Sequence, residues 1–343
     1  MSRVVLAANN GEVGGGEVML LATAQALRDL GVDVQLVGPS TPDGVLDHGA
    51  RLGFEVTRLP GDRRAYLARL RGWSAGQPGW MWCHGLVPSL ATAGRPRRIV
   101  HLHQGPARLH AAAVRIARRG AAAVLVPSQS MARTVPGAEV LWNWSAAQPG
   151  SPPHRSLHEP VRVGFIGRHS ADKGLHVLAG AVRRLEEAQP GRWRLVLAGD
   201  DRFVPEDQRR RVAHALDGID SLTSRLGWCD RAAFFAAVDV AAFPSTWAEP
   251  FGLVATEAMS ARVPCVVSDA GALPEVLGPA HPWVARAGDV EDLATVVRRC
   301  AEASPGDRQA VVERAHARWE RYFSPDAGRE RVASLVTRLG VLT

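Results

Sequence analysis

Two basic side chains in the second half of the chain, Arg168 and Lys173, stand between a strand pattern and a helix pattern. In VRVGFIGRHSADKGLHVL, residues 161–178, the apolar run ends at Gly167. Apolar residues then recur at helical spacing, which predicts buried positions at Leu175, Leu178, Val182 and Leu185. Cations at the carboxyl end of a parallel strand, beside a helix N-terminus, favour binding of a diphosphate.

The composition also singles out Lys173. The chain holds 41 basic residues, and every one of them except Lys173 is arginine. A lysine in such a chain indicates a position that needs a compact charge, because a planar guanidinium approaches a single phosphate oxygen less closely. The alternative is a lysine placed there by chance.

A pair of glutamates, Glu249 and Glu257, forms the second candidate group, in STWAEPFGLVATEAM, residues 245–259. Pro250 favours the first turn of a helix, so a helix is expected to start near Phe251 or Gly252 and to carry Glu257. Carboxylates accept hydrogen bonds from the vicinal hydroxyls of a ribose or a hexose. Unpaired amides at a helix start suit an anion or sugar hydroxyls, and here they belong to Phe251, Gly252, Leu253 and Val254.

A glycine-rich turn near the N-terminus is the third candidate. Residues 3–8 form a strand pattern that leads into Gly14, Gly15 and Gly16 and then into a helix. Its inward positions are expected to be Val18, Leu21, Leu27 and Leu30. Such a turn exposes amides to a phosphate or a sugar, although a purely structural tight turn is an equal alternative.

The segments that position these residues alternate between short apolar runs and helical patterns along the whole chain, which favours an α/β protein with parallel sheets. Length predicts two domains. We place an N-terminal domain at 1–146, a linker rich in proline, glycine and serine at 147–160, and a second domain at 161–325. The chain closes with an amphipathic helix at about 326–343. Its apolar pattern does not indicate which domain it packs against, and packing back onto the N-terminal domain is one option.

These motifs together resemble retaining glycosyltransferase family 4. The segment from Glu249 to Glu257 looks like the E-x7-E signature of that family, and GALPEV at 271–276, GRHSADKG at 167–174 and the glycine-rich N-terminal loop match as well. The resemblance implies the GT-B fold, in which two Rossmann-like domains place parallel sheets across a cleft. It covers nearly the whole chain and is most specific in the carboxyl half.

The resemblance also implies roles for the carboxyl-half residues. Arg168 and Lys173 would bind the donor diphosphate and stabilise the leaving group, while Gly167 lies at the same turn. Glu257 would accept from the ribose hydroxyls, and Glu249 would hold the transferred sugar together with the amides that follow it. The backbone around Trp228 would meet the base.

The amino half supplies the remaining implied groups. The loop from Gly14 to Gly16 would lie over the diphosphate, and His103 resembles a family histidine near the donor sugar, which makes it the fourth catalytic candidate. We expect His101 to point to the opposite face of the same strand as a core residue. His84, at another strand end, is a weaker candidate for the acceptor side.

Composition bounds the partners. Residues 1–150 hold 16 basic and 9 acidic side chains, whereas residues 151–343 hold 25 of each, so the positive excess lies in the amino half. Basic stretches at 63–71 and 108–119 fit an anionic acceptor or weak peripheral contact with a membrane, or else are solvated helix faces. Nucleic acid is not expected, because these stretches lack interleaved aromatics and recognition motifs.

The cysteine spacing and the carboxylates argue against a metal or other cofactor. Four cysteines show no C-x-x-C or zinc spacing, and Asp200 and Asp201 are adjacent instead of forming Asp-x-Asp. No apolar run is long enough to span a bilayer, and we expect a cytoplasmic protein that contacts the inner membrane face at most peripherally.

The expected activity is metal-independent transfer of a hexose-type sugar, with retention of configuration, from a nucleotide diphosphate donor. UDP is favoured over GDP, and the acceptor is a small molecule, a glycan or a lipid-linked molecule. The alternatives are a GT-B epimerase and a non-catalytic nucleotide-sugar-binding or membrane-associated subunit with the same fold.

Overall fold

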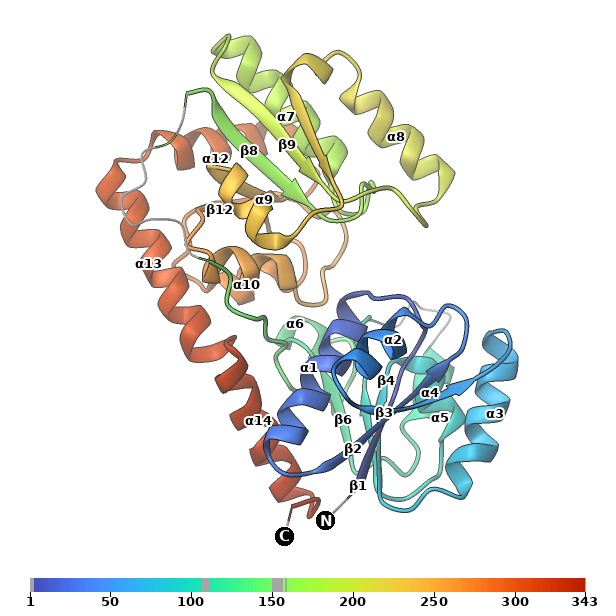
Figure 1. The fold of residues 1–343 in the computed structure, drawn as a ribbon. Coiled ribbons are helices and arrows are strands. Elements are labelled where there is room, and N and C mark those ends of the chain that lie inside the picture. The colour runs from blue at the N-terminus through green and yellow to red at the C-terminus, as the bar shows by residue number, and fades with distance from the viewer. Residues whose placement is uncertain (1–2, 106–110, 150–156, 158, 343) are drawn as a thin grey trace. The chain divides into compact units, whose positions relative to one another are not determined.

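The structure is a computed structural model that describes residues 3–105, 111–149, 157 and 159–342. The chain divides into two compact units (Figure 1). One unit combines Met1–Trp144 with Pro325–Thr343, and the other is Ser145–Ser324. Each is a Rossmann-like domain with a wholly parallel sheet between helices, as the alternating pattern predicted.

The N-terminal unit has a seven-stranded sheet in the order β3-β2-β1-β4-β5-β6-β7. Its strands are β1 (Arg3–Ala7), β2 (Asp33–Pro39), β3 (Glu55–Leu59), β4 (Trp80–His84), β5 (Arg98–His101), β6 (Ala123–Val126) and β7 (Glu139–Val140). The helices of this unit are α1 (Gly15–Asp29), α2 (Gly44–Arg51), α3 (Arg63–Ala75), α4 (Leu86–Ala91), α5 (Ala111–Ala117), α6 (Gln129–Ala132) and α14 (Pro325–Arg338).

The closing helix α14 packs on the N-terminal unit, against α1. Gly328 of α14 lies so close to the indole of Trp144 that a Cβ there would be 2.3 Å from the ring. The helix therefore contacts both the first helix of the unit and the last residue before the chain enters the other unit.

The C-terminal unit has a six-stranded sheet in the order β10-β9-β8-β11-β12-β13. Its strands are β8 (Val161–Ile166), β9 (Trp193–Ala198), β10 (Thr223–Gly227), β11 (Val240–Phe243), β12 (Cys265–Ser268) and β13 (Val284–Ala285). Its helices are α7 (Leu175–Ala188), α8 (Glu206–Leu216), the 3-10 turn η2 (Asp220–Leu222), α9 (Arg231–Ala237), α10 (Leu253–Ser260), α11 (Leu273–Leu277), α12 (Val290–Glu302) and α13 (Pro305–Tyr322).

The apolar core of the C-terminal unit explains why α7 sits where it does. All four positions predicted to face inward on this helix are buried, and they pack with Trp193 of β9 in one cluster. Burial of each such side chain contributes roughly 1.5–3 kcal/mol. The strand β8 and the helix α7 are thus fixed by packing, and the loop between them is held at the carboxyl edge of the sheet.

The orientation of α1 differs from our expectation at its first turn. Val18 was expected to face inward, but its side chain is 41% exposed, whereas Glu17 is buried. Leu21 and Leu27 are buried as expected, and Leu30 is half-buried. The apolar periodicity holds along the helix and fails beside the glycine loop, because a carboxylate takes the inner position there.

The expected linker, 147–160, falls largely outside the described residues, since 150–156 and 158 are not described. Its first part belongs to the C-terminal unit: the amide of Gln148 donates to Ser260. Just before it, the amide of Ser145 donates to the carbonyl oxygen of Phe323. The chain thus leaves the N-terminal unit at Trp144 and packs at once on α10 and the end of α13.

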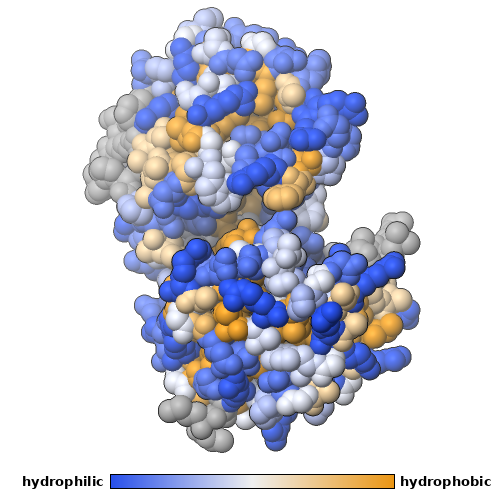
Figure 2. Space-filling view, turned by 45° about the vertical axis from the view of Figure 1, so that its right-hand side comes forward, coloured by the Kyte–Doolittle hydropathy of each residue, from blue (hydrophilic) through white to orange (hydrophobic). Residues whose placement is uncertain are grey.

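Neither the surface nor the cysteines mark a particular site. The face seen in Figure 2 mixes hydrophilic side chains with small apolar areas. None of the described helices has the length and apolarity needed to cross a membrane. All four cysteines are free thiols, and three of them are buried.

Candidate functional site

The centre of the C-terminal site is an ion pair between two residues 76 positions apart. The ammonium group of Lys173 lies 3.0 and 2.8 Å from the two carboxylate oxygens of Glu249. Two more donors reach the same carboxylate: the hydroxyl of Ser245 at 3.0 Å and the indole N–H of Trp247 at 3.2 Å. Glu249 is therefore held in a fixed orientation. Its Oε2 atom accepts from all three donors, whereas Oε1 accepts only from Lys173 and keeps a site for a further donor.

The backbone of Glu249 is fixed by a close approach of another loop. The amide of Ala272 donates to the carbonyl oxygen of Glu249 at 2.8 Å. Gly271 has φ +62°, and a Cβ there would lie 2.3 Å from the backbone nitrogen of Glu249. Only glycine fits this position, for both reasons. The G-A-L-P-E motif that follows β12 therefore supports the loop that carries Glu249.

The loop that carries Lys173 is tied to the same region. The amide of Thr246 donates to the carbonyl oxygen of Asp172 at 2.9 Å, and its hydroxyl donates to that of Ala171 at 2.9 Å. Gly174 is left-handed, and a Cβ there would lie 1.7 Å from the carbonyl oxygen of Pro244. The carboxyl ends of β8 and β11 are thus locked together, which places Lys173 on Glu249.

Arg168 stands at the start of the same loop and is half-exposed. Its guanidinium lies 3.3 Å from the carboxylate of Asp172, which also accepts from the amide of Lys173. Gly167 precedes it with φ +146°, and a Cβ at Gly199 would lie 2.1 Å from the carbonyl oxygen of Gly167. The two predicted cations thus share one loop, in which Asp172 contacts the side chain of Arg168 and the backbone of Lys173, and Arg168 stays accessible to a ligand.

Helix α10 begins later than Pro250 predicted. Gly252, left-handed at φ +92°, is the N-cap, and the first helical residue is Leu253. Phe251 is buried in the preceding loop and meets the ring of Phe323 edge-on at 5.5 Å. The amides of Leu253 and Val254 have no acceptor among the described residues. Pro250 starts a turn that anchors Phe251, and the amides of Phe251 and Gly252 in that turn likewise have no acceptor among the described residues.

Glu257 lies within α10 and has a partner that the sequence did not indicate. Its carboxylate accepts from Nε of Arg231, in α9, at 2.9 Å. Burial raises the pKa of Glu257, and the neighbouring Arg231 opposes that rise. The glutamate is mostly buried, so only a small part of it is open to a ribose hydroxyl.

Trp228, which follows β10, is 71% exposed. The guanidinium of Arg202 lies 5.6 Å from the centre of its ring. The amide of Gly199 donates to the carbonyl oxygen of Gly227 at 2.7 Å, which joins the ends of β9 and β10. An exposed indole beside a strand end is suited to stacking on a planar base.

In the N-terminal unit, the glycine loop already holds a carboxylate. Gly14 is the N-cap of α1, and its amide donates to the carbonyl oxygen of Glu12 at 3.1 Å. The backbone of Asn10, Gly14 and Glu17 acts to lower the pKa of the Glu17 carboxyl. Burial nevertheless raises the pKa of Glu17 to about 7, with a small contribution from Glu12. One of the amides that the sequence offered to a phosphate, that of Gly14, is thus engaged within the loop.

Three histidines meet at the ends of two neighbouring strands. His84 and His101 are register partners on β4 and β5, and His103 follows two residues later. Nδ1 of His84 lies 2.9 Å from Nε2 of His103, and the rings of His101 and His103 are 4.1 Å apart. The expectation that His101 points to the opposite face was wrong, because side chains two residues apart lie on the same face of a strand.

Gly16 explains how the glycine loop fits over these rings. A Cβ at Gly16 would lie 3.2 Å from Cδ2 of His103. A larger residue at this position would push against the imidazole. The glycine loop and His103 are therefore neighbours within the N-terminal unit. A role for both at one site requires this proximity.

Family models match both units of the chain. A model described as glycosyl transferases group 1 matches residues 160–303, and one described as glycosyltransferase family 4 matches residues 13–137. The chain belongs to glycosyltransferase family 4. The first segment contains the Lys173–Glu249 pair, and the second contains the glycine loop and the three histidines.

The chain also resembles curated proteins in sequence and solved structures in fold. Glycogen synthase of Mycobacterium tuberculosis is 33% identical over 190 residues, 53% of this chain and 41% of that protein. D-inositol 3-phosphate glycosyltransferase of Stackebrandtia nassauensis is 27% identical over 86% of this chain and 80% of its own length. The structure of Anabaena HepE in complex with UDP-glucose superimposes with a TM-score of 0.85 at 21% identity, over 98% of this chain and 100% of that one.

These likenesses establish the GT-B fold for this family 4 chain. The chain spans about two fifths of the length of the curated relatives it matches first. The solved structure of HepE covers nearly the whole of this chain, but its sequence identity is low, so the similarity shows the fold alone.

Among the residues described, the three histidines are the one group whose ring nitrogens could hold a metal ion, with all three within 4.8 Å of one another. Their outer nitrogens have no acceptor among the described residues. Metal-bound histidines nearly always donate the second ring N–H to a carboxylate, a carbonyl or a water. An ion would leave three such donors unpaired, whereas the hydrogen bond between His84 and His103 leaves two, so this family 4 site fits hydrogen bonding better than metal binding.

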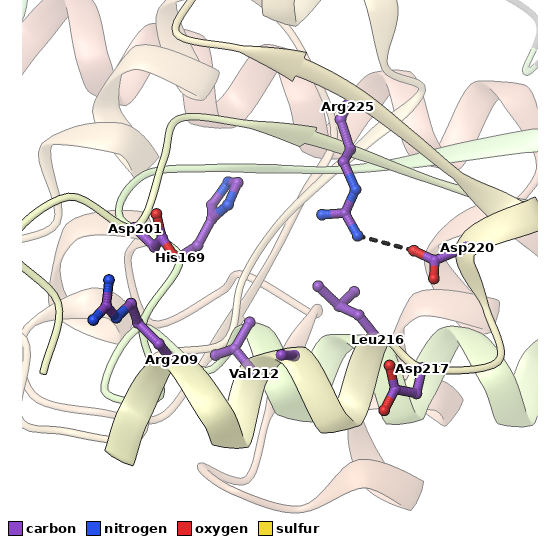
Figure 3. A pocket seen from close by; sticks show the side chains of 9 residues that line it. His169, Asp201, Arg209, Val212, Leu216, Asp217, Asp220 and Arg225 are labelled. Carbon is purple, nitrogen blue, oxygen red and sulfur yellow. Dashed lines mark hydrogen bonds and ion pairs between the residues drawn. The ribbon is translucent and has the colours of Figure 1, made fainter. Parts of the chain in front are cut away.

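A separate polar pocket of about 220 Å³ opens in the C-terminal unit, between α8 and the ends of β9 and β10 (Figure 3). In it, Arg225 reaches Asp220 at 3.0 Å, and His169 and Asp201 face it from the loops after β8 and β9. No predicted site residue lines it. Its charges are mixed and largely neutralise each other, so it does not resemble a diphosphate clamp.

Sequence reasoning missed several residues that shape the site: Glu17, Asp172, Arg231, Ser245 and Trp247. Glu17 had a signal, because a glutamate three residues after an N-cap is the spacing of a capping box. Ser245 and Trp247 lie within four residues of Glu249, which allows contact in a tight loop. Arg231 had no such signal, since its contact with Glu257 depends on how α9 packs beside α10.

Proposed function

We propose that this family 4 chain transfers a hexose-type sugar from a nucleotide diphosphate to an acceptor, with retention of anomeric configuration and without a metal ion. The observation that carries the proposal is the convergence of Lys173 on Glu249 beside Arg168, in one loop system of the C-terminal unit. A basic point charge and an oriented carboxylate are what a diphosphate and a sugar hydroxyl would respectively need.

Bound donor would rearrange the Lys173–Glu249 pair only slightly. A diphosphate oxygen offers Lys173 a second anionic partner. Glu249 stays oriented by Ser245 and Trp247 and keeps an acceptor site for a sugar hydroxyl. The pair therefore holds both side chains in position before the donor arrives, which limits the reorganisation required during the reaction.

The chemical step builds negative charge on the leaving diphosphate and positive charge on the anomeric carbon. The bond from that carbon to the phosphate oxygen breaks, the bond to the acceptor oxygen forms on the same face, and the acceptor proton passes to the leaving phosphate oxygen. Arg168, Lys173 and the free amides of Leu253 and Val254 would stabilise the charge that develops on the diphosphate. No carboxylate nucleophile is required in this scheme.

The carboxylates that a metal-dependent enzyme would use are engaged elsewhere. Asp200 accepts from the guanidinium of Arg202 at 2.6 Å and from its amide at 3.1 Å. Asp201 faces the separate pocket beside α8. This arrangement supports stabilisation of the diphosphate by protein cations instead of a divalent ion.

For the donor we favour a UDP-sugar, with a GDP-sugar second. Support comes from HepE, a structural neighbour with UDP-glucose bound. For the acceptor we favour an anionic small molecule, glycan or lipid-linked molecule, because the positive excess lies in the amino half. The molecule in the name of one relative, D-inositol 3-phosphate glycosyltransferase, is itself anionic.

Peripheral contact with the inner face of a membrane belongs to the same proposal. Four arginines of α3 are exposed: Arg63, Arg64, Arg69 and Arg71. The second basic stretch lies in part outside the described residues, which resume at 111. Sedimentation with anionic and with neutral vesicles, at low and high salt, tests this contact. Equal binding to both vesicle types would reject it.

The test of the activity is nucleotide release from UDP-hexoses and GDP-hexoses, with and without chelator and with a panel of anionic acceptors. We expect release at the same rate in chelator and a product with the anomeric configuration of the donor. Loss of activity in chelator would reject metal independence, and an inverted product would reject retention. Donor binding without release would indicate a binding subunit, and a changed donor sugar without release would indicate an epimerase.

A further inference from the structure

The two carboxylate oxygens of Glu257 are in different situations. Oε2 accepts from Nε of Arg231 at 2.9 Å. Oε1 accepts from none of the described residues and, unlike several ring nitrogens of the three histidines, it is not fully enclosed. The side chain as a whole is only 15% exposed. A ligand that reaches Glu257 therefore meets one open acceptor atom on a largely enclosed carboxylate.

The start of α9 fixes the position of Arg231. Asp230 is the N-cap of this helix, and its carboxylate accepts from a backbone amide of the first turn at 2.7 Å. Phe234 and Phe235, in the same helix, are buried. A Cβ at Gly164 of β8 would lie 2.9 Å from the ring of Phe234. Helix α9 is thus packed closely on the sheet, and its first residue, Arg231, is held in place with it.

Burial and the ion pair act in opposite directions on Glu257. Burial raises the pKa of its carboxyl, because the charged form loses the water that would solvate it. Arg231 lowers that pKa through its charge and its hydrogen bond. An ionised carboxylate accepts at both oxygens, whereas a protonated one carries its proton on one of them. Arg231 therefore favours the form of Glu257 that can accept from a ligand.

An ion pair between two elements can also be purely structural, and the same unit offers one for comparison. Nε of Arg262 lies 3.5 Å from the carboxylate of Glu313 in α13, and the Arg262 side chain is 35% exposed, against 36% for Arg231. The partners differ: Glu313 is 45% exposed and well solvated. Such a surface pair contributes little and orients nothing for a ligand. Only the pair of Arg231 holds an enclosed carboxylate with an open oxygen.

We propose that Arg231 is a positioning residue: by holding Oε2 of Glu257 it leaves Oε1 as the open acceptor, so that the site recognises a single ribose hydroxyl of the donor nucleotide. The inference rests on the proposed function, which supplies a nucleotide diphosphate. A carboxylate with both oxygens open can accept from both vicinal hydroxyls of a ribose. Glu257 has one oxygen engaged by Arg231, so the second hydroxyl finds no open atom on it.

Nucleotide binding tests the single acceptor without any need for turnover. The probes are UDP and GDP, each with its 2′-deoxy and 3′-deoxy forms, titrated by calorimetry into the full-length chain. We expect one deoxy form of the bound nucleotide to bind about 10–100-fold more weakly than its parent, the effect of one lost hydrogen bond to a charged group. The other deoxy form should bind almost as well as the parent. Equal losses with both deoxy forms, or no loss with either, overturn the proposal.

Three variants test the role of Arg231 itself. Arg231→Met keeps an unbranched side chain and removes the charge and the donor. We expect the parent nucleotide to bind to it about 10–100-fold more weakly, down to the level of the discriminated deoxy form, whose own affinity should change little. Arg231→Lys restores a cation beside Oε2 and should recover most of the discrimination. Arg262→Met is the matched control and should leave every affinity near the wild-type value.

A purely structural ion pair would give a different result. Arg231→Met would then weaken the parent and both deoxy nucleotides by the same factor, or lower only the melting temperature, and either outcome overturns the positioning role. A wild-type chain that binds neither UDP nor GDP overturns the proposed function and this inference together. A wild-type chain that binds one of them and releases it from a sugar donor, but treats the parent and both deoxy forms alike, overturns this inference alone.

Discussion

The two units build their sites from opposite kinds of interaction. In the C-terminal unit every predicted charged group has an opposite charge: Lys173 pairs with Glu249, Arg168 with Asp172, and Glu257 with Arg231. In the N-terminal unit the predicted site residues, the glycines at 14–16 and His103, carry no charge. Its histidines have lowered pKa values, and Glu17 is buried without a cation in contact among the described residues.

Under the proposed function, this difference would separate two tasks. Paired charges can exchange partners with a diphosphate, because the incoming anion meets cations that are already oriented. Neutral donors and acceptors can hold sugar hydroxyls without competing for the diphosphate. The proposed function would then concentrate electrostatic stabilisation in the C-terminal unit and hydrogen bonding in the N-terminal unit, although the formal positive excess lies in the amino half.

The largest effect on the charged site of the C-terminal unit is expected from removal of the Lys173 side chain. Lys173→Ala leaves Glu249 with two neutral donors and no cation, and we expect kcat for nucleotide release to fall about 10²–10³-fold, as for loss of one preorganised charge-stabilising group. The ion pair is partly exposed, at 26% and 11%, so the melting temperature should change by only a few degrees. Turnover at the wild-type rate would remove Lys173 from the diphosphate site.

Lys173→Arg is the matched substitution, since it keeps the charge and changes its shape. A guanidinium can still pair with Glu249 but presents a planar fork to the diphosphate. We expect a loss of about tenfold or more, smaller than that of the alanine variant. Activity close to the wild type would show that the lone lysine of the chain has no special role.

Much of the C-terminal site could be predicted, because local patterns fix it. A strand that ends at Ile166 and a helix with inward Leu175 and Leu178 leave the loop between them, with Arg168 and Lys173, at the sheet edge. Local patterns could not predict the contact of Lys173 with Glu249, because it depends on the hydrogen bond from Thr246 to the loop before α7. The sequence predicted the residues and their neighbourhood, and tertiary packing determined which of them pair.

The N-terminal site was predicted less well, for two physical reasons. Apolar periodicity placed Val18 inward, but the amides of the glycine loop draw the carboxylate of Glu17 inside instead. The histidine group was misjudged through the strand period, which places His101 and His103 together. The contact with His84 adds a neighbouring strand, whose register no single-strand pattern reveals.

Gly271→Ala sharpens the comparison by testing how rigidly the C-terminal site is held. The added Cβ would lie 2.3 Å from the backbone of Glu249, so the loop must shift. We expect a loss of roughly 1–3 kcal/mol in stability and about tenfold in kcat, through displacement of Glu249. Gly288→Ala is the control, because Gly288 is also left-handed and nothing lies within 4 Å of its Cβ position.

In the control we expect only the backbone strain, about 1 kcal/mol or a few degrees in melting temperature, with unchanged kcat. Thermal unfolding and nucleotide release measured on both variants separate the two effects. If both glycine variants lose stability and activity equally, close approach to Glu249 is not what holds the site.

Glu17→Gln tests the neutral character of the N-terminal site and has the smallest expected effect. The folded chain holds the pKa of Glu17 at about 7, above the ordinary value of 4.5, mainly through burial. Below pH 4.5 the group is protonated whether the chain is folded or unfolded. Between pH 4.5 and about 7 the unfolded chain releases the proton first, so stability falls as the pH rises, and above about 7 the loss is complete.

Relative to Glu17→Gln, the wild type should therefore lose up to about 3 kcal/mol of stability from pH 4.5 to 7 and no more above it. The measurement is the difference in melting temperature between the two proteins at a series of pH values, with Glu12→Gln, an exposed neighbour in the same loop, as the control. A difference that does not change with pH would mean that the loop amides keep Glu17 ionised. The N-terminal site would then carry a charge like its counterpart, and the contrast between the units would not hold.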